Sequence, residues 1–174
     1  EIIQNHINLI IIHQKDLNVY DAYNKALKIA KGKYVFILNS DDKISENSFH
    51  KFYQLYKLNP DYDLYSSGGI EFDSTLTKTL RKRFFTNPKF FSRGIINFKG
   101  QSILGCYIKL DLYKKLNFFD ISFNISSDKD FLIKMSLSKI KCFEMNHFSY
   151  IIRSHKNSIT FGGTPEKELL NIIN

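Results

Sequence analysis

The sequence predicts an α/β protein in which a mixed, mainly parallel sheet is flanked by helices. Five apolar or aromatic residues, Tyr34–Leu38, follow Gly32 and end abruptly in polar residues, which is typical of a fully buried strand. A helical pattern precedes them, and strand-like and helix-like segments alternate along much of the remaining chain. A buried strand without a polar face belongs in a sheet that is covered on both sides.

The first part of the chain predicts a strand, a helix and a second strand. Asn8–His13 is a short apolar run, and apolar residues then recur at helical spacing from Val19 to Ala30, where Gly32 closes the helix. With Tyr34–Leu38 these segments form a predicted βαβ unit. Such a unit implies a right-handed crossover and a parallel pair of strands.

The middle of the chain predicts a second helix and three strands. Ser45 can cap a helix that runs to Leu58 and carries an aromatic stripe, which we expect to pack in the core. The predicted strands are Tyr62–Ser67 and Ile70–Phe72, separated by a break at Gly68-Gly69, and Ser102–Ile108.

The C-terminal part predicts three helices and two short strands. They are a short helix capped by Asp111, a helix over Asp128–Ser138 entered through Ser126-Ser127, strands at Phe143–Met145 and Tyr150–Ile152, and a terminal helix after the turn at Gly162-Gly163 and Pro165. No linker or repeat divides the chain, so residues 1–174 predict a single domain.

The composition predicts a globular protein with an anionic partner. Lys and Arg number 25 against 17 Asp and Glu, for a net charge of +8 and a pI near 9.3, which suits nucleic acid, nucleotide phosphates or an acidic membrane face. Cys106 and Cys142 are expected to be buried free thiols. No apolar run reaches the roughly 18 residues that span a bilayer. Motifs for dinucleotide binding, P-loops, α/β-hydrolases and zincins are absent.

Two groups of carboxylates are candidates for chemistry. Asp41 and Asp42 follow the predicted central strand, at the carboxyl end where such sheets bind ligands. Two adjacent ionised carboxylates favour a bound cation, whereas a turn or helix cap would explain the pair without a ligand. Asp128 and Asp130 lie at a predicted helix start, where they either complement the helix dipole or supply a catalytic base opposite a cation.

Two long segments resemble the family 2 glycosyltransferases. They are DLNVYDAYNKALKIAKGKYVFILNSDD, which starts at Asp16, and GQSILGCYIKLDLYKKLNFFDISFNISSDKDFLIKM, which starts at Gly100; ITFGG is similar to the family's late Gly-Gly turn. The resemblance runs from Asp16 to Gly163 and is of the colanic-acid and exopolysaccharide type. It implies a GT-A-like fold and a metal-dependent, inverting transfer of a sugar from a nucleoside-diphosphate sugar to a hydroxyl of a saccharide or lipid-linked acceptor. Surface polysaccharide or glycolipid assembly would be the setting.

The resemblance also implies a role for each candidate residue. Asp41, with Asp42, stands at the family's DxD-type motif and would bind a Mn²⁺ or Mg²⁺ ion that bridges the donor diphosphate. Asp128 takes the place of the base that deprotonates the acceptor hydroxyl. The nucleotide- and donor-binding residues implied in the same way are Asp21, Asn24, Asn39 and Gln101.

The chain departs from the family pattern at three places. Gly100 replaces a His before Gln101, and Asn18 replaces a common Gly. The family's first βα unit, with an acidic segment that grips the base, is not in the sequence, which predicts an N-terminally truncated domain. This departure leaves a second hypothesis, a non-catalytic remnant or binding module of the same fold.

A basic aromatic stretch, Lys78–Arg93, has two interpretations. It could contact anionic lipid headgroups or a polyprenyl diphosphate acceptor, or it could be a hairpin whose phenylalanines cover the sheet. The expected location is the cytoplasm, with peripheral contact at the inner face of an anionic plasma membrane. RRM, KH and helix-turn-helix patterns are absent, so nucleic acid is not an expected partner.

Overall fold

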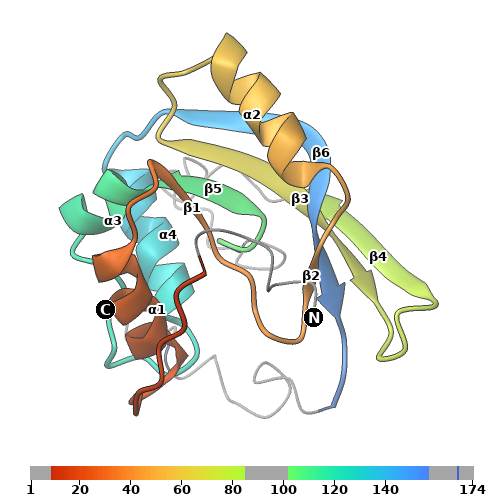
Figure 1. The fold of residues 1–174 in the computed structure, drawn as a ribbon, viewed down its shortest axis with the longest axis horizontal. Helices are drawn as coiled ribbons and strands as arrows, with labels where there is room; N and C mark the ends of the chain where they lie inside the picture. Colours follow the sequence, from red (N-terminus) through yellow and green to blue (C-terminus); the bar gives the residue numbers. More distant parts are fainter. Residues whose placement is uncertain (1–8, 85–101, 157–167, 169–174) are drawn as a thin grey trace.

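Six strands form one curled sheet with helices on both of its faces (Figure 1). The structure is a computed structural model that describes residues 9–84, 102–156 and 168. The strands are β1 (Tyr34–Phe36), β2 (Lys43–Ile44), β3 (Leu64–Phe72), β4 (Thr79–Phe84), β5 (Cys106–Lys109) and β6 (Cys142–Arg153). The helices are α1 (Val19–Ile29), α2 (Ser48–Leu58), α3 (Leu110–Lys115) and α4 (Ser127–Leu137).

The α/β class and the mixed sheet are confirmed, but the sheet is not mainly parallel in the described part of the chain. Its strands are ordered β1-β5-β3-β6-β2, and β4 pairs with β3. Only β3 and β6 pair in parallel; the other four pairings are antiparallel. The reason is that β5 lies between β1 and β3 and runs against both, so β1 and β3 point the same way but are not neighbours.

The predicted strand at Asn8–His13 is wrong for the residues that the structure describes. Residues 9–13 have no strand structure, and the side chains of Leu9, Ile10, Ile11 and Ile12 are exposed. An apolar run becomes a strand only where a neighbouring strand takes up its backbone hydrogen bonds. Among the described strands β1 pairs only with β5, so the predicted βαβ unit does not form here. β1 is correspondingly short and half-buried rather than fully buried.

Two hydrophobic clusters hold the helices against the sheet. The larger one joins α1, α3 and α4 to one face, and the smaller one joins α2 to the other (Figure 1). In the smaller cluster the ring of Phe52 stacks on Tyr107 with 4.1 Å between centroids. The predicted aromatic core stripe of α2 is therefore correct for Phe52 and Tyr56, whereas Phe49 and Tyr53 remain exposed.

Helix starts differ from the predicted caps. α2 begins at Ser48 rather than after Ser45, because the Ser45 hydroxyl donates to the carbonyl of Phe148 on β6. Asp111 lies inside the first turn of α3 instead of capping it. α4 begins at Ser127, one residue before the predicted start, so that helix is confirmed.

The two glycines predicted to break a strand lie inside β3, which is continuous from Leu64 to Phe72. At Gly68 the ring of Phe148 lies directly against the backbone: a Cβ atom there would be 2.5 Å from Phe148 Cδ1 and 2.8 Å from the Arg83 carbonyl oxygen. Gly68 thus makes room for an aromatic ring on the sheet. β6 is likewise one strand, where two short ones were predicted.

Gly68→Ala should lower the free energy of unfolding by about 1–3 kcal/mol, because either the Phe148 ring or β4 must shift to relieve the overlap. Urea denaturation followed by circular dichroism measures this loss. Gly32→Ala is the milder comparison, since its Cβ would meet the Tyr34 carbonyl oxygen at 3.3 Å. Equal stability of Gly68→Ala and the wild type would contradict the assigned packing.

Some predictions reach only partly into the described residues. The basic aromatic stretch contributes β4, which pairs antiparallel with β3, while its residues 85–93 lie outside the described part. The predicted helix after Pro165 also lies outside it, apart from Glu168, which is helical. Both cysteines are free thiols; Cys106 is buried, and burial raises its pKa to about 12, whereas Cys142 is half-buried.

Candidate functional site

Helix α1 connects the two acidic segments singled out in the sequence. The Tyr20 hydroxyl lies 2.6 Å from the carbonyl oxygen of Ile125 and 3.2 Å from Asp128 Oδ1, at the start of α4, and its one proton is shared between these two acceptors. Tyr23 donates to Asn39 Oδ1 at 2.5 Å, in the turn after β1. The two tyrosine rings meet edge to face with 6.0 Å between centroids. One face of α1 therefore lies between the Asn39 turn and Asp128.

Asn18 determines where α1 begins and what it contacts. Its Oδ1 atom accepts hydrogen bonds from the backbone N–H groups of Tyr20 and Asp21, which caps the helix. Its Nδ2 atom donates to the carbonyl of Ile121 at 3.0 Å. The same side chain thus starts the helix and ties it to the loop that precedes α4.

The charges around Tyr23 show how close the two acidic segments lie. The pKa of Tyr23 is raised to about 12, mainly by burial and then by the negative charges of Asp128, Asp42 and Asp41. A single hydroxyl therefore experiences the fields of all three carboxylates. The structure brings together the residues that the sequence placed in separate blocks.

Asp41 has a partner that the sequence did not reveal. Its Oδ2 atom lies 2.7 Å from Nε2 of His155, just beyond the end of β6. The two residues are 114 positions apart, and no metal-binding spacing or motif links them in the sequence. An imidazole nitrogen and a carboxylate oxygen thus meet at the turn after β1.

Asp42 is engaged in a different way. Its carboxylate accepts hydrogen bonds from the Arg153 backbone N–H at 2.9 Å, from the Tyr150 hydroxyl at 2.9 Å and from Asn39 Nδ2 at 3.1 Å. Burial raises the pKa of Asp42, and the charge of Asp41 adds to that rise, while the three hydrogen bonds oppose it. These contacts fasten the turn after β1 to the end of β6.

Both polar atoms of the Asn39 side chain, Oδ1 and Nδ2, form hydrogen bonds with neighbouring residues. Besides its contacts with Tyr23 and Asp42, its backbone N–H donates to the Tyr150 hydroxyl at 3.0 Å. The predicted contact of Asn39 with a nucleotide stays a prediction. What the structure shows is a connector between α1, the acidic turn and β6.

Asp128 is a carboxylate in a largely buried setting. Burial raises its pKa, and the nearby positive charge of Lys129 and the hydrogen bond from Tyr20 oppose that rise. Lys129 Nζ lies 3.9 Å from Asp128 Oδ2. Asp130 lies two residues further along the first turn of α4 and instead forms an ion pair with Lys134, with 2.6 Å between Oδ2 and Nζ. A carboxylate with a raised pKa is suited to accept a proton near neutral pH.

Glu168 braces the loop that presents Asp128. Its carboxylate accepts hydrogen bonds at 2.9–3.0 Å from three successive backbone N–H groups. They belong to the residues directly before α4: Asn124, Ile125 and Ser126. The sequence contained no signal for this contact, because Glu168 is one of many surface-type acids. It is a positioning contact for the start of α4.

Two other predicted nucleotide-binding residues have structural partners. Asp21 Oδ2 accepts from the Leu17 backbone N–H at 3.0 Å and lies 2.9 Å from Lys25 Nζ, and both contacts lower its pKa. Asn24 is buried and bonds to both the backbone N–H and the carbonyl of Phe119. Their contact with a nucleotide stays a prediction, and Gln101 lies outside the described residues.

The turn after β1 holds one pair of side chains that could contribute to a metal site, Asp41 and His155. Across the residues that the structure describes, no group of three or more His, Cys, Asp and Glu side chains is arranged to hold a metal by protein ligands alone. Asp41 and His155 supply two ligand atoms of the kinds that transition-metal ions accept. Any ion there would take its remaining ligands from substrate and water.

The curled mixed sheet with helices on both faces is a GT-A-like glycosyltransferase fold. The chain belongs to glycosyl transferase family 2, whose model matches residues 1–119, a range that includes Asp41 and ends before Asp128. None of the curated proteins matches the chain. No helix among the described residues is both long and apolar enough to cross a membrane.

Two solved structures are similar in fold. One is residues 1–349 of S. aureus TarS in complex with UDP, with a TM-score of 0.55, 15% identity, and coverage of 80% of this chain and 41% of that one. The other is S. aureus TarS, with a TM-score of 0.53, 16% identity, and coverage of 80% and 25%. The chain therefore spans less than half the length of either protein.

Proposed function

We propose that this protein transfers a sugar from a nucleoside-diphosphate sugar to a hydroxyl group of an acceptor, with inversion and with the help of a divalent metal ion. The observation that carries the proposal is the meeting of the Asp41 turn and Asp128 around α1, through Tyr23 and Tyr20. Family membership supports glycosyl transfer, and the UDP in the TarS complex supports a nucleotide donor. A saccharide or lipid-linked acceptor, surface polysaccharide or glycolipid assembly, and peripheral membrane contact stay predictions.

Asp41 and His155 are the proposed protein ligands of the metal ion. A carboxylate and an imidazole suit Mn²⁺, and the carboxylate also suits Mg²⁺. The ion would neutralise charge on the diphosphate leaving group. Asp42 is assigned a supporting role instead, because three donors already occupy its carboxylate.

Asp128 is the proposed base. Its carboxylate takes the proton of the acceptor hydroxyl as that oxygen attacks the anomeric carbon, and the bond from that carbon to the diphosphate oxygen breaks. A single displacement of this kind inverts the anomeric centre. The raised pKa of Asp128 favours proton capture, and the hydrogen bond from Tyr20 keeps the carboxylate oriented.

Calorimetric titration with UDP tests the donor and metal assignments together. With Mn²⁺ present, UDP should bind at least about tenfold more tightly than in the presence of a chelator, a difference of about 1.4 kcal/mol. The nucleotide is the probe, so the result does not depend on knowing the sugar or the acceptor. Equal affinity in both conditions would overturn the metal assignment, and no binding in either would favour a non-catalytic remnant.

A further inference from the structure

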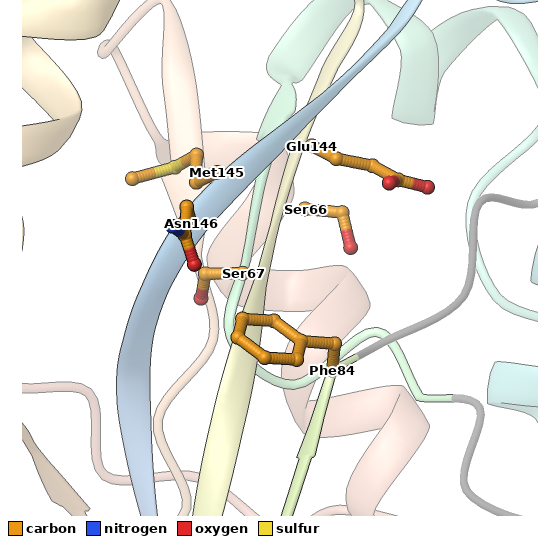
Figure 2. A pocket seen from close by; sticks show the side chains of 6 residues that line it. All are labelled: Ser66, Ser67, Phe84, Glu144, Met145 and Asn146. Atoms are coloured by element: carbon orange, nitrogen blue, oxygen red, sulfur yellow. The ribbon is translucent and has the colours of Figure 1, made fainter.

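A pocket of about 300 Å³ opens on the sheet where β3, β6 and the end of β4 meet. Its walls combine one aromatic ring and one methionine with two hydroxyl groups, one carboxylate and one amide (Figure 2). The lining residues are Ser66, Ser67, Phe84, Glu144, Met145 and Asn146. Asp41, Asp42, His155 and Asp128 are not among them.

Part of the pocket lining lies on the same face of the sheet as α4. Leu64 on β3 and Cys142 on β6 are paired residues that pack in the cluster with α4. Side chains along a strand alternate between faces, so Ser66 and Glu144, each two residues further on and again paired, face the same side. These two lining residues therefore belong to the surface on which α4 sits, whereas the lining residue Met145 packs in the cluster with α2 on the other face.

The charges on β4 and α4 agree with this placement. Burial lowers the pKa of Lys129, the charge of Asp128 opposes the effect, and the positive charge of Arg83 lowers it further. Lys129 follows Asp128, and Arg83 precedes Phe84 in the pocket wall. The end of β4 and the first turn of α4 therefore lie within electrostatic reach of each other.

The walls suit a carbohydrate ring. Phe84 is 53% exposed although its ring packs on Phe148 with 4.5 Å between centroids, so an open aromatic surface remains. The absence of a side chain at Gly68 leaves the space that the Phe148 ring occupies. A pyranose has an apolar face of C–H groups and an edge of hydroxyls; Phe84 matches the face, while Glu144 and Asn146 match the edge. The volume is at the lower end of the range for ligand pockets, about 300–1,000 Å³.

We propose that this pocket binds a hexopyranose ring of the acceptor, next to the hydroxyl that reacts at Asp128. The proposal rests on the proposed function, since it makes the substrate receiving the sugar a saccharide. Phe84 supplies the stacking surface, and Glu144 accepts hydrogen bonds from sugar hydroxyls. A lipid or a peptide would not need a carboxylate and an amide beside a single aromatic ring.

Saturation-transfer NMR without nucleotide tests the pocket directly. The probes are the methyl glycosides of glucose, galactose, N-acetylglucosamine and N-acetylgalactosamine. At least one should bind the wild type, and both Phe84→Ala and Glu144→Gln should weaken it on the order of fivefold or more. Leu80→Ala is the matched control, because Leu80 is 49% exposed on the same strand and does not line the pocket.

The outcomes separate this inference from the proposed function. Binding of no glycoside, or unchanged binding by both Phe84→Ala and Glu144→Gln, would overturn the pocket assignment even if UDP binds with Mn²⁺. Loss of glycoside binding in both variants with unchanged UDP binding would support it. Glycoside binding in a protein that binds no UDP would retain the pocket and reject the donor assignment.

Discussion

Asp128→Asn should strongly slow sugar transfer and at the same time make the folded protein more stable. The transfer rate should fall about 100- to 10,000-fold, which is the usual contribution of a positioned general base. The amide has nearly the same shape and can still accept the hydrogen bond from Tyr20, so UDP affinity should be unchanged. Initial rates of transfer and UDP titration of the same preparation provide both measurements.

The gain in stability follows from the burial of Asp128. A carboxyl group whose pKa is raised in the folded protein binds its proton more tightly there than in the unfolded chain, so ionisation opposes folding. The cost is absent below the unfolded pKa of about 3.9. It grows as the pH rises through that value, and it is complete above the raised pKa. At pH 7 Asp128→Asn should gain about 0.5–2 kcal/mol, and near pH 3.5 the gain should vanish.

Asp130→Asn is the matched control for this prediction. Asp130 lies on the same first turn of α4, but it pairs with Lys134 rather than with Tyr20. Its replacement should leave the transfer rate nearly unchanged. A normal rate in Asp128→Asn would mean that another residue is the base, and a stability gain that does not depend on pH would reject the role of burial.

Asp41→Asn should impair metal-dependent binding of UDP, whereas Asp42→Asn should impair stability, although the two residues are adjacent. Asp41→Asn should weaken the Mn²⁺-dependent binding of UDP by at least about tenfold and leave stability nearly intact, because its one described side-chain partner is His155. Asp42→Asn should lower stability by about 1–3 kcal/mol, because the hydrogen bonds that it loses outweigh the relief from no longer burying a charge. An amide has one acceptor oxygen, whereas the Asp42 carboxylate uses both of its oxygens to accept three hydrogen bonds.

Thermal unfolding and UDP calorimetry on both variants separate the two roles. His155→Ala should reproduce the loss of metal-dependent binding seen in Asp41→Asn, since the two side chains are proposed to share the ion. If His155→Ala kept full metal dependence, the ion would lie elsewhere. If Asp42→Asn retained wild-type stability, its contacts with β6 would be energetically unimportant.

The local features of the fold could be predicted from the sequence. Helical spacing and the end at Gly32 placed α1, and the spacing of apolar residues placed α4. The adjacent acids at Asp41 and the acid at Asp128 stood out because each follows or begins a recognisable element. Such signals depend on residues within one or two turns of each other, so the sequence alone contains them.

The order and direction of the strands could not be predicted in the same way. The apolar run at Asn8–His13 has the composition of a strand, but strand formation depends on a partner for its backbone groups. The glycines at Gly68-Gly69 look like a break, but Phe148, far along the chain, explains Gly68 as a site of close packing. The composition of a segment shows whether it can form a strand, whereas pairing with a neighbouring strand determines whether it does.

For the site itself, the sequence by itself determined that acidic residues follow β1 and begin α4, and that α1 lies between them in the chain. Only the tertiary structure decided their roles. It set His155 against Asp41, joined Asp42 to β6, and placed Tyr20 and Tyr23 between the two acidic segments. The physical reason is that these contacts link residues up to 114 positions apart, so they exist only once the sheet has brought its strands together.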